Sequence, residues 1–478
     1  MCADTTGGTR PTQPARRAPF VRRSSLGWAP FAALLGLACS IGTGARADAI
    51  PAGWTASKMQ AVGYSGLDGH VAPFKMAIRK VGERWYMYAA HSGRGGLSIV
   101  DVTDAANPKL VKFIAGPPGT SSGQVTIHDN LLVWGMAKPY TAEQTSGNYV
   151  WQRSLEPAAP ADKTYQEGAR FYDISDPTDP KYLSQWEGGA AGTHRNGYPG
   201  GRYAYMSSTV AGYSGNILVI VDVGDPAHPK EAGRWWYPGQ KDGETPPANL
   251  FSSFHGPANV SPDGKTISTG YTPAIVNLDI SDVAHPRMIG QVVMSPPFAE
   301  VGIQSVHSVL PLWDRGLLYA NSESQRVECR EGLQWAGLFD NKNPAKPFLI
   351  SLFPIPVPPV DAPFKDFCDK GGRFGPHNTN QEIHLPDVEK PGNLIYLTYF
   401  NAGLRVFDIG KPRLPTEVGW FVPPNPEKPM VSQAGQIKVN QTQDVLVDTR
   451  GFIYLTDSAW GIWIVRYTGE GQPTPTAR

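Results

Sequence analysis

The chain repeats one pattern of apolar and polar positions: a short apolar run, an Asp, a Pro-containing turn and a second short apolar run. Two clear copies are GLSIVDVTDAANPKLVKFI and NILVIVDVGDPAHPKEAGRW. β-Branched and aromatic residues bounded by Asp, Pro and Gly predict pairs of β-strands. The seven copies, of which the fifth and sixth are more diverged and the last is truncated, begin at Gly96, Gly168, Asn216, Pro273, Leu333, Gly403 and Gly461.

The repeated Asp sets the register of the copies. The Pro of each turn removes a backbone donor, and the Asp can accept hydrogen bonds from the turn. Most copies follow another strand pair, such as SVLPLWDRGLLYANS from Ser308. Four strands in each of seven units predict an all-β chain, a seven-bladed β-propeller of four-stranded antiparallel blades. The register residues are Asp101, Asp173, Asp222, Asp279, Asp340 and Asp408, with Arg466 in the seventh copy.

The truncated seventh unit lacks its fourth strand. The segment KMQAVGYS, which begins at Lys58, is well placed to supply it. We therefore expect an N-terminal strand to close the propeller, which would leave no open sheet edge.

Strings such as LVIVDVGDP from Leu218 and FYDISDP from Phe171 resemble the LVIVD-repeat bacterial β-propellers. The resemblance covers nearly the whole chain after residue 47. It implies the propeller fold and says little about chemistry, because that family is functionally diverse.

Residues 1–47 have the features of a secretory signal peptide: basic residues, an apolar stretch, and a small-residue cleavage site ending at Ala47. Arg22-Arg23 resembles a twin-arginine signal without its usual aromatic residue. The chain is thus expected to be periplasmic or secreted, with the propeller over residues 48–470 and a disordered tail over 471–478. No later stretch is long and apolar enough to span a bilayer.

Signal cleavage would leave two cysteines, Cys329 and Cys368. In an oxidising compartment they would most simply form one disulfide, and two free thiols are the alternative.

Charge excludes some partners. Lys and Arg number 43 and Asp and Glu 42, with no basic stripe interleaved with aromatic residues. This balance does not suit binding to nucleic acid or to an anionic membrane. The expected partner is instead a small organic molecule or a secreted or cell-surface protein, and the chain is expected to be a monomer.

Extra sequence between the predicted strands selects one face of the propeller. The insertions fall at about 137–166 and 323–333, between second and third strands, and at about 237–251 and 353–376, between blades. In antiparallel four-stranded blades both kinds of connection emerge on the same face. Long loops over a rigid scaffold are where binding and catalysis usually occur.

Four histidines are predicted at the channel mouth on that face. His255 and His307 each precede a turn glycine by nine residues, and therefore occupy the same position in consecutive blades. His194 falls within about one residue of that position in the third blade, and His377 lies five residues before it in the sixth. Neutral imidazoles that converge in this way suit copper or iron, and less well zinc.

Other residues could support such a site. Glu382 aligns with His307, and could be a ligand or an acceptor that fixes an imidazole tautomer. His384, His128, His70 and His91 are further candidates. His228 and His285, in repeated Ala-His-Pro turns, are expected to be ordinary turn residues.

The residues predict a metal-dependent oxidoreductase that acts on a small organic substrate. Two readings of the histidines stay open beside it: a metal-free polar pocket, and a purely structural role. The alternative function is a non-catalytic secreted module that binds a protein or another ligand through the same face.

Overall fold

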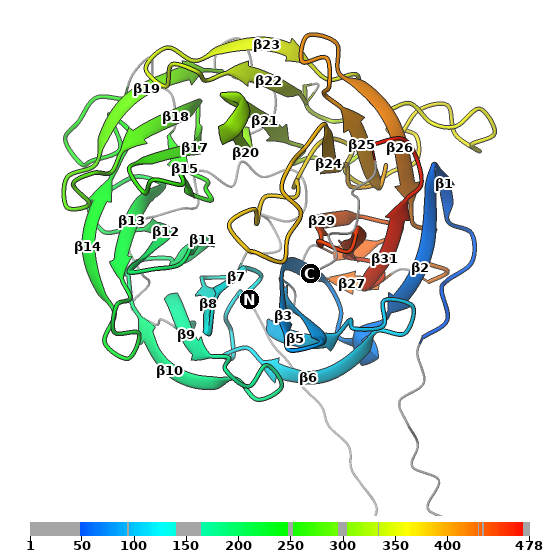
Figure 1. Ribbon diagram of the computed structural model, residues 1–478, viewed down its shortest axis with the longest axis horizontal. Helices are drawn as coiled ribbons and strands as arrows, with labels where there is room; N and C mark the ends of the chain where they lie inside the picture. Colours follow the sequence, from blue (N-terminus) through cyan, green and yellow to red (C-terminus); the bar gives the residue numbers. More distant parts are fainter. Residues whose placement is uncertain are drawn as a thin grey trace, which may run out of the picture. The chain divides into compact units, whose positions relative to one another are not determined.

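A computed structural model describes residues 48–92, 95–139, 164–246, 252–294, 304–332, 334–428, 430–432 and 435–471. The predicted signal peptide, most of the 137–166 insertion and all but the first residue of the predicted tail lie outside these ranges. The described residues belong to one compact unit. Within it, seven four-stranded antiparallel sheets form the propeller ring that the repeats predict (Figure 1).

The first three sheets each follow chain order from the innermost strand to the outermost. Their strands are β3 (Pro73–Val81), β4 (Arg84–His91), β5 (Gly96–Asp101) and β6 (Lys109–Ala115); β7 (Val125–His128), β8 (Leu131–Met136), β9 (Gly168–Asp173) and β10 (Lys181–Trp186); and β11 (Thr193–Gly197), β12 (Tyr203–Thr209), β13 (Asn216–Asp222) and β14 (Lys230–Trp235).

The fourth and fifth sheets keep this order, except that the innermost strand of the fourth is interrupted. Their strands are β15 (Ser253–Phe254) with β16 (Asn259–Val260), β17 (Thr266–Thr272), β18 (Ala274–Asp279) and β19 (Arg287–Val293); and β20 (Gln304–Leu312), β21 (Leu317–Glu323), β22 (Ala336–Asp340) and β23 (Phe348–Leu352).

The last two sheets combine strands from both ends of the described chain. In the sixth, β24 (Leu394–Thr398), β25 (Leu404–Asp408) and β26 (Thr416–Val422) are followed outward by β1 (Thr55–Ser57). In the seventh, β29 (Thr442–Val447), β30 (Phe452–Asp457) and β31 (Ile462–Tyr467) are followed by β2 (Met59–Ser65). β2 pairs with β31 in the position where the truncated repeat lacks a strand.

The sixth sheet has no regular innermost strand. Residues 377–379 run beside β24 and make ladder hydrogen bonds, with His377 N donating to Thr398 O at 2.9 Å and Thr398 N to Asn378 O at 2.9 Å. Beyond Thr379, which forms an isolated bridge with Leu397, the chain leaves the sheet. Among the described residues, the short elements outside the seven sheets are η1 (Leu67–Gly69), η4 (Trp313–Arg315) and the hairpin of β27 (Met430–Ser432) and β28 (Gly435–Ile437).

The repeated Asp residues end the third strand of each of the first five sheets and β25 of the sixth, and their side chains bind the turn that follows. In each copy one carboxylate oxygen accepts a hydrogen bond from the backbone N–H two residues later, as in Asp101 to Thr103 at 2.9 Å and Asp408 to Gly410 at 2.7 Å. This is the Asx turn that the sequence pattern predicts. The same bond occurs at Asp173, Asp222, Asp279 and Asp340.

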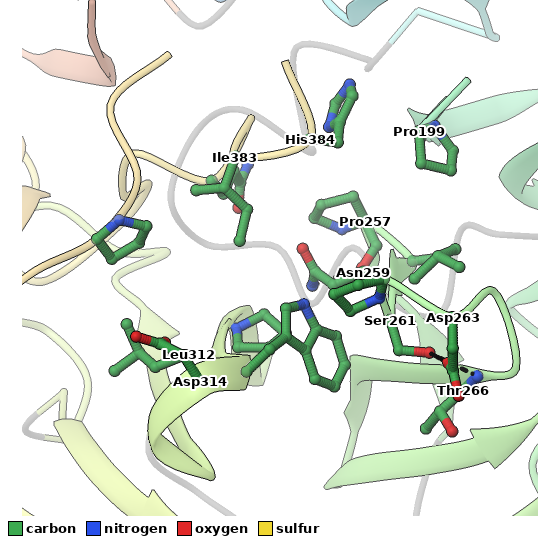
Figure 2. A pocket seen from close by; sticks show the side chains of 18 of the residues that line it. Pro199, Pro257, Asn259, Ser261, Asp263, Thr266, Leu312, Asp314, Ile383 and His384 are labelled. Atoms are coloured by element: carbon green, nitrogen blue, oxygen red, sulfur yellow. Dashed lines mark hydrogen bonds between the residues drawn. The ribbon is translucent and has the colours of Figure 1, made fainter. Parts of the chain in front are cut away.

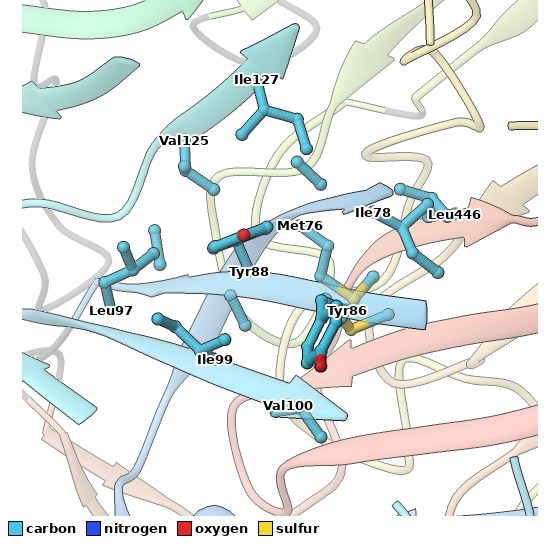
Figure 3. Packing of buried hydrophobic residues seen from close by; sticks show 14 of the residues in the cluster. Met76, Ile78, Tyr86, Tyr88, Leu97, Ile99, Val100, Val125, Ile127 and Leu446 are labelled. Atoms are coloured by element: carbon cyan, nitrogen blue, oxygen red, sulfur yellow. The ribbon is translucent and has the colours of Figure 1, made fainter. Parts of the chain in front are cut away.

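Apolar side chains fill the space between neighbouring sheets. Around the first sheet, Met76, Ile78 and Tyr88 pack with Val125 of the second sheet and Leu446 of the seventh (Figure 3). Both faces of each sheet are therefore buried. This burial keeps the innermost strands in a fixed register and orients their side chains at the channel. No helix among the described residues is long and apolar enough to cross a membrane.

Candidate metal centre

The four histidines predicted at the channel mouth lie next to one another. His194 is in β11, His255 directly follows β15, His307 is near the start of β20, and His377 precedes β24. Successive ring centroids are 4.9, 4.0 and 4.7 Å apart along the row from His194 to His377. The Nε2 atoms of His194 and His255 are 3.2 Å apart.

A carboxylate that the sequence analysis missed completes the cluster. Glu323, the last residue of β21, places one oxygen 3.4 Å from His307 Nε2 and the other 3.6 Å from His377 Nε2. In His255, His307 and Glu323, one potential ligand atom from each lies within 4.8 Å of the others, so these three side chains could hold a metal ion. Only its position in the sequence could have indicated this residue, because Glu323 is where the 323–333 insertion begins.

A backbone carbonyl group fixes the tautomer of His377. Its Nδ1 donates to Gln443 O at 2.6 Å. Because a carbonyl oxygen can only accept, the ring proton of His377 lies on Nδ1 and its Nε2 lone pair points toward Glu323. This is the arrangement found around metal-binding histidines. Nδ1 of His307 lies 2.9 Å from Ser308 Oγ and 3.1 Å from His377 O.

Burial keeps these imidazoles neutral. His255, His307 and His377 are each no more than 2% exposed. Burial, reinforced by nearby positive charge, holds the pKa of each well below its usual value. A neutral imidazole is the form that binds a metal. Burial also raises the pKa of Glu323 to about 7, opposed by Arg373 and Arg195.

Two guanidinium groups contact the cluster. Arg195, fully buried in β11, donates to Gly256 O at 3.0 Å and Asn378 Oδ1 at 2.8 Å, and its Nη2 lies 3.4 Å from His307 Nε2. Arg373 donates to Glu323 Oε1 at 3.1 Å. Arg373 also stacks over the ring of Phe400 at 3.8 Å, which in turn stacks on His377.

Two of the predicted insertions form a wall beside the cluster. The disulfide expected from the sequence joins Cys329 in one insertion to Cys368 in the other. Glu328 N donates to Gly372 O at 2.7 Å, and an isolated β-bridge joins Val327 to Arg373. These links hold Arg373 over Glu323.

The structure places Glu382 in a separate ionic cluster rather than beside His307. Its carboxylate lies 3.1 Å from Lys75 Nζ, which is also 3.3 Å from Asp444, and it accepts from Thr126 Oγ1 at 3.3 Å. The alignment that paired Glu382 with His307 assumes a regular innermost strand, and the sixth sheet has none beyond Thr379. The buried Lys75 instead joins the first, sixth and seventh blades.

The remaining candidate histidines lie in two other groups. His384 is 3.7 Å from Glu382 and stacks with His128 at 6.1 Å between ring centroids. His91 bonds Val71 O and Ser98 Oγ, while His70 stacks on Phe113. His228 and His285 lie in the Ala-His-Pro turns, each paired with the Asp three residues before it.

A groove of about 1240 Å³ opens at the opposite ends of the innermost strands. Figure 2 shows Pro257, Asn259, Asp263, Asp314 and His384 around it. Because it is lined by the turns that follow the innermost strands, the groove is on the other face from the four histidines.

Comparison with known proteins agrees with this architecture. The family model of the LVIVD repeat matches residues 85–114 and 200–236, in the first and third blades. No curated protein is significantly similar to the chain in sequence.

Among solved structures, the β-propeller domain of Myceliophteria thermophila Cps50 (Swd1) is similar at 10% identity, over 83% of this chain and 96% of that one, with a TM-score of 0.48. The periplasmic gluconolactonase PpgL of Pseudomonas aeruginosa is similar at 11% identity, over 83% and 97%, with a TM-score of 0.47. The chain is a seven-bladed β-propeller that contains LVIVD repeats.

Proposed function

We propose that this propeller binds one transition metal ion through His255, His307 and Glu323, with His194 and His377 as further ligands. The observation that carries the proposal is the convergence of one carboxylate and four neutral imidazoles from four neighbouring blades. Side chains that far apart in sequence meet only because the ring brings the starts of its innermost strands together.

The separations match those of atoms that share an ion. Two ligand atoms bound at about 2.1 Å lie about 3.0 Å apart at a right angle and about 3.4 Å apart at a tetrahedral angle. The observed pairs are 3.2 Å for His194 and His255, 3.4 Å for His307 and Glu323, and 3.6 Å for His377 and Glu323.

His255 supports the same assignment. Its Nδ1 atom is buried and makes no well-aligned hydrogen bond among the described residues. Backbone groups of Gly256 and His307 are nevertheless close enough to favour the protonated form of the His255 ring. Its Nε2 faces His194, an equally neutral ring. A shared ion would satisfy both Nε2 atoms at once.

The imidazole and carboxylate ligands suit copper or iron. Zinc fits less well with the oxidation of a substrate. Imidazole nitrogen with one carboxylate is a common ligand set for these metals. A redox-active ion here would support oxidation of a small organic substrate, while zinc would support hydrolysis through activated water. In either case the chain holds the ion with its Nε2 atoms and Glu323, and the wall of insertions limits access from solvent.

We further propose that the chain is exported and acts as a monomer in the periplasm or outside the cell. The Cys329–Cys368 disulfide supports export, because disulfides persist mainly in oxidising compartments. The mass of the protein purified from its own host tests it: a chain that begins at Asp48 is expected, and a chain that retains residues 1–47 would contradict export by cleavage.

Metal content tests the main proposal. Protein from its own host would be analysed by mass spectrometry beside a His255→Ala/His307→Ala double variant and a His228→Ala/His285→Ala control. About one copper or iron per chain is expected in wild type and control, and a loss of at least about tenfold in the first variant. Metal-free wild type with an intact fold would favour the binding module instead.

A further inference from the structure

The irregular sixth blade leaves room for the groove on the face opposite the four histidines. Beyond Thr379 the chain follows the seventh blade, where Asn380 Oδ1 accepts from Val447 N at 3.1 Å and Glu389 N donates to Val447 O at 2.9 Å. This segment forms one side of the groove of about 1240 Å³, and turns of the third, fourth and fifth blades form the rest. The groove therefore lies where an innermost strand is missing.

Gln381 gives the groove a buried polar group without a partner. The residue lines the groove and is 2% exposed. Neither its amide nitrogen nor its amide oxygen has a hydrogen-bond partner among the described residues. A buried amide in this state costs free energy unless a bound molecule supplies the missing partners. Because the amide offers both donor hydrogens and an acceptor, its complement is a group that also donates and accepts, such as a hydroxyl.

Three further side chains offer acceptor oxygens along the groove. The amide nitrogen of Asn259 donates to Ser268 O at 3.1 Å and to Val309 O at 2.8 Å, so its oxygen is the atom that remains for a ligand. Asp263 and Asp314 are exposed at the rim, and Figure 2 shows them with Asn259 around the groove. Since carboxylates only accept, a molecule bound here must bring several donors.

Trp313 adds a flat apolar surface to these polar groups. It begins η4, is partly exposed and lines the groove. An indole face packs against flat apolar groups of a ligand. Charges of both signs also line the groove, with Lys342 and Lys390 beside Asp263 and Asp314, so the lining favours neither an anion nor a cation.

We infer that the groove binds a neutral oligosaccharide. Hydroxyl groups of one sugar would bond both atoms of the Gln381 amide, and neighbouring hydroxyls would donate to Asn259, Asp263 and Asp314. The apolar face of a sugar ring would pack on Trp313. Pockets for single drug-sized molecules measure about 300–1,000 Å³, so a groove of about 1240 Å³ has room for more than one sugar. This site is separate from the proposed metal centre and does not depend on it.

Calorimetric titration of the protein purified from its own host tests the inference. The probes are the neutral trisaccharides maltotriose, cellotriose and chitotriose, with pentaglycine as a neutral peptide. Binding of at least one trisaccharide, and none of pentaglycine, is expected. Gln381→Met keeps the length of the side chain but removes both polar atoms, and should weaken sugar binding at least about tenfold. Trp313→Ala should weaken it by a similar factor.

Two readouts separate a binding role for Gln381 from a structural one. Since its amide has no bond to lose within the chain, Gln381→Met should unfold at the same urea concentration as wild type or a higher one. Its metal content should also equal that of wild type. Gln60→Met is the matched control, because Gln60 is exposed in β2 and outside the groove, and it should leave sugar affinity unchanged.

Three results would overturn the inference and leave the proposed metal site standing. One is that no trisaccharide binds at millimolar concentration. Another is equal sugar affinity in Gln381→Met and wild type, which would place the sugar elsewhere. The third is binding of pentaglycine alone, which would make the groove a peptide site.

Discussion

Glu323 Oε2 lies 3.4 Å from Nε2 of His307, although the two residues come from different strands of the fifth blade. β20 carries His307 to the channel, and β21 returns from the opposite end of the sheet to bring Glu323 back to the same mouth. One hairpin therefore supplies two of the three side chains that could hold an ion.

Replacement of Glu323 by Gln should weaken metal binding at least about tenfold. The amide keeps the shape of the side chain but removes the negative charge that offsets Arg373. Calorimetric titration with copper measures this. Glu328→Gln, at an exposed position of the same insertion, is the control, and equal affinities in the two variants would exclude Glu323 as a ligand.

Removal of the Cys329–Cys368 disulfide should destabilise the propeller by roughly 4 kcal/mol, if unfolding remains two-state. The two cysteines are 39 residues apart, and cross-linking a loop of that length removes about this much chain entropy from the unfolded state. Urea unfolding of a Cys329→Ser/Cys368→Ser variant, compared with wild type, gives the value. A loss below about 1 kcal/mol would mean that the wall is held by its other contacts.

Glu389→Gln should stabilise the protein at alkaline pH. Burial, and then the nearby carboxylate of Asp448, raise the pKa of Glu389 to about 8 from an ordinary 4.5. Since the folded state favours the protonated form, the contribution of this group is fully present below pH 4.5 and is lost as the pH rises through 8. The difference between pKa values of 4.5 and about 8, at about 1.4 kcal/mol per pKa unit, sets an upper limit of about 5 kcal/mol on the gain in unfolding free energy at pH 9.

At pH 4 the same substitution should have little effect. Glu83→Gln is the control, because the Glu83 side chain is 97% exposed. A gain for Glu389→Gln that is the same at both pH values would refute the assignment to its ionisation.

Asp222→Ala should cost roughly 1–1.5 kcal/mol of unfolding free energy, and Asp340→Ala less. Asp222 accepts from Gly224 N at 3.0 Å and from Arg202 at 2.8 Å. Asp340 accepts from Lys342 N at 3.1 Å, but the Lys342 ammonium is 4.0 Å away. Parallel denaturation curves for the two variants compare their losses of unfolding free energy. A larger loss for Asp340→Ala than for Asp222→Ala would mean that the hydrogen bond to the turn contributes more than the neighbouring cationic side chain.

The repeats predict the fold well because their information is local. Each repeat has an apolar run, an Asp that binds its own turn and a Pro, and each of these acts within a few residues. The same local pattern therefore identifies every blade in the sequence. Counting residues from the turn glycines likewise brings His255 and His307 to equivalent positions, since an innermost strand advances by a fixed rise per residue.

Prediction was weaker where the structure departs from the repeat. Glu323 comes from a second strand, and no repeated position marks it. Glu382 lies beyond the irregular end of the innermost segment of the sixth blade, so its alignment with His307 gave the wrong neighbours. The addition of β1 to the sixth sheet depends on contacts between distant parts of the chain, which a local pattern does not encode.

Crystals of protein purified from its own host, measured at the absorption edge of the metal found in it, would show directly where the ion binds. One anomalous peak is expected within about 2.2 Å of His255 Nε2, His307 Nε2 and a Glu323 oxygen. A peak elsewhere, such as beside His128 and His384, or no peak in protein that retains its fold, would contradict it.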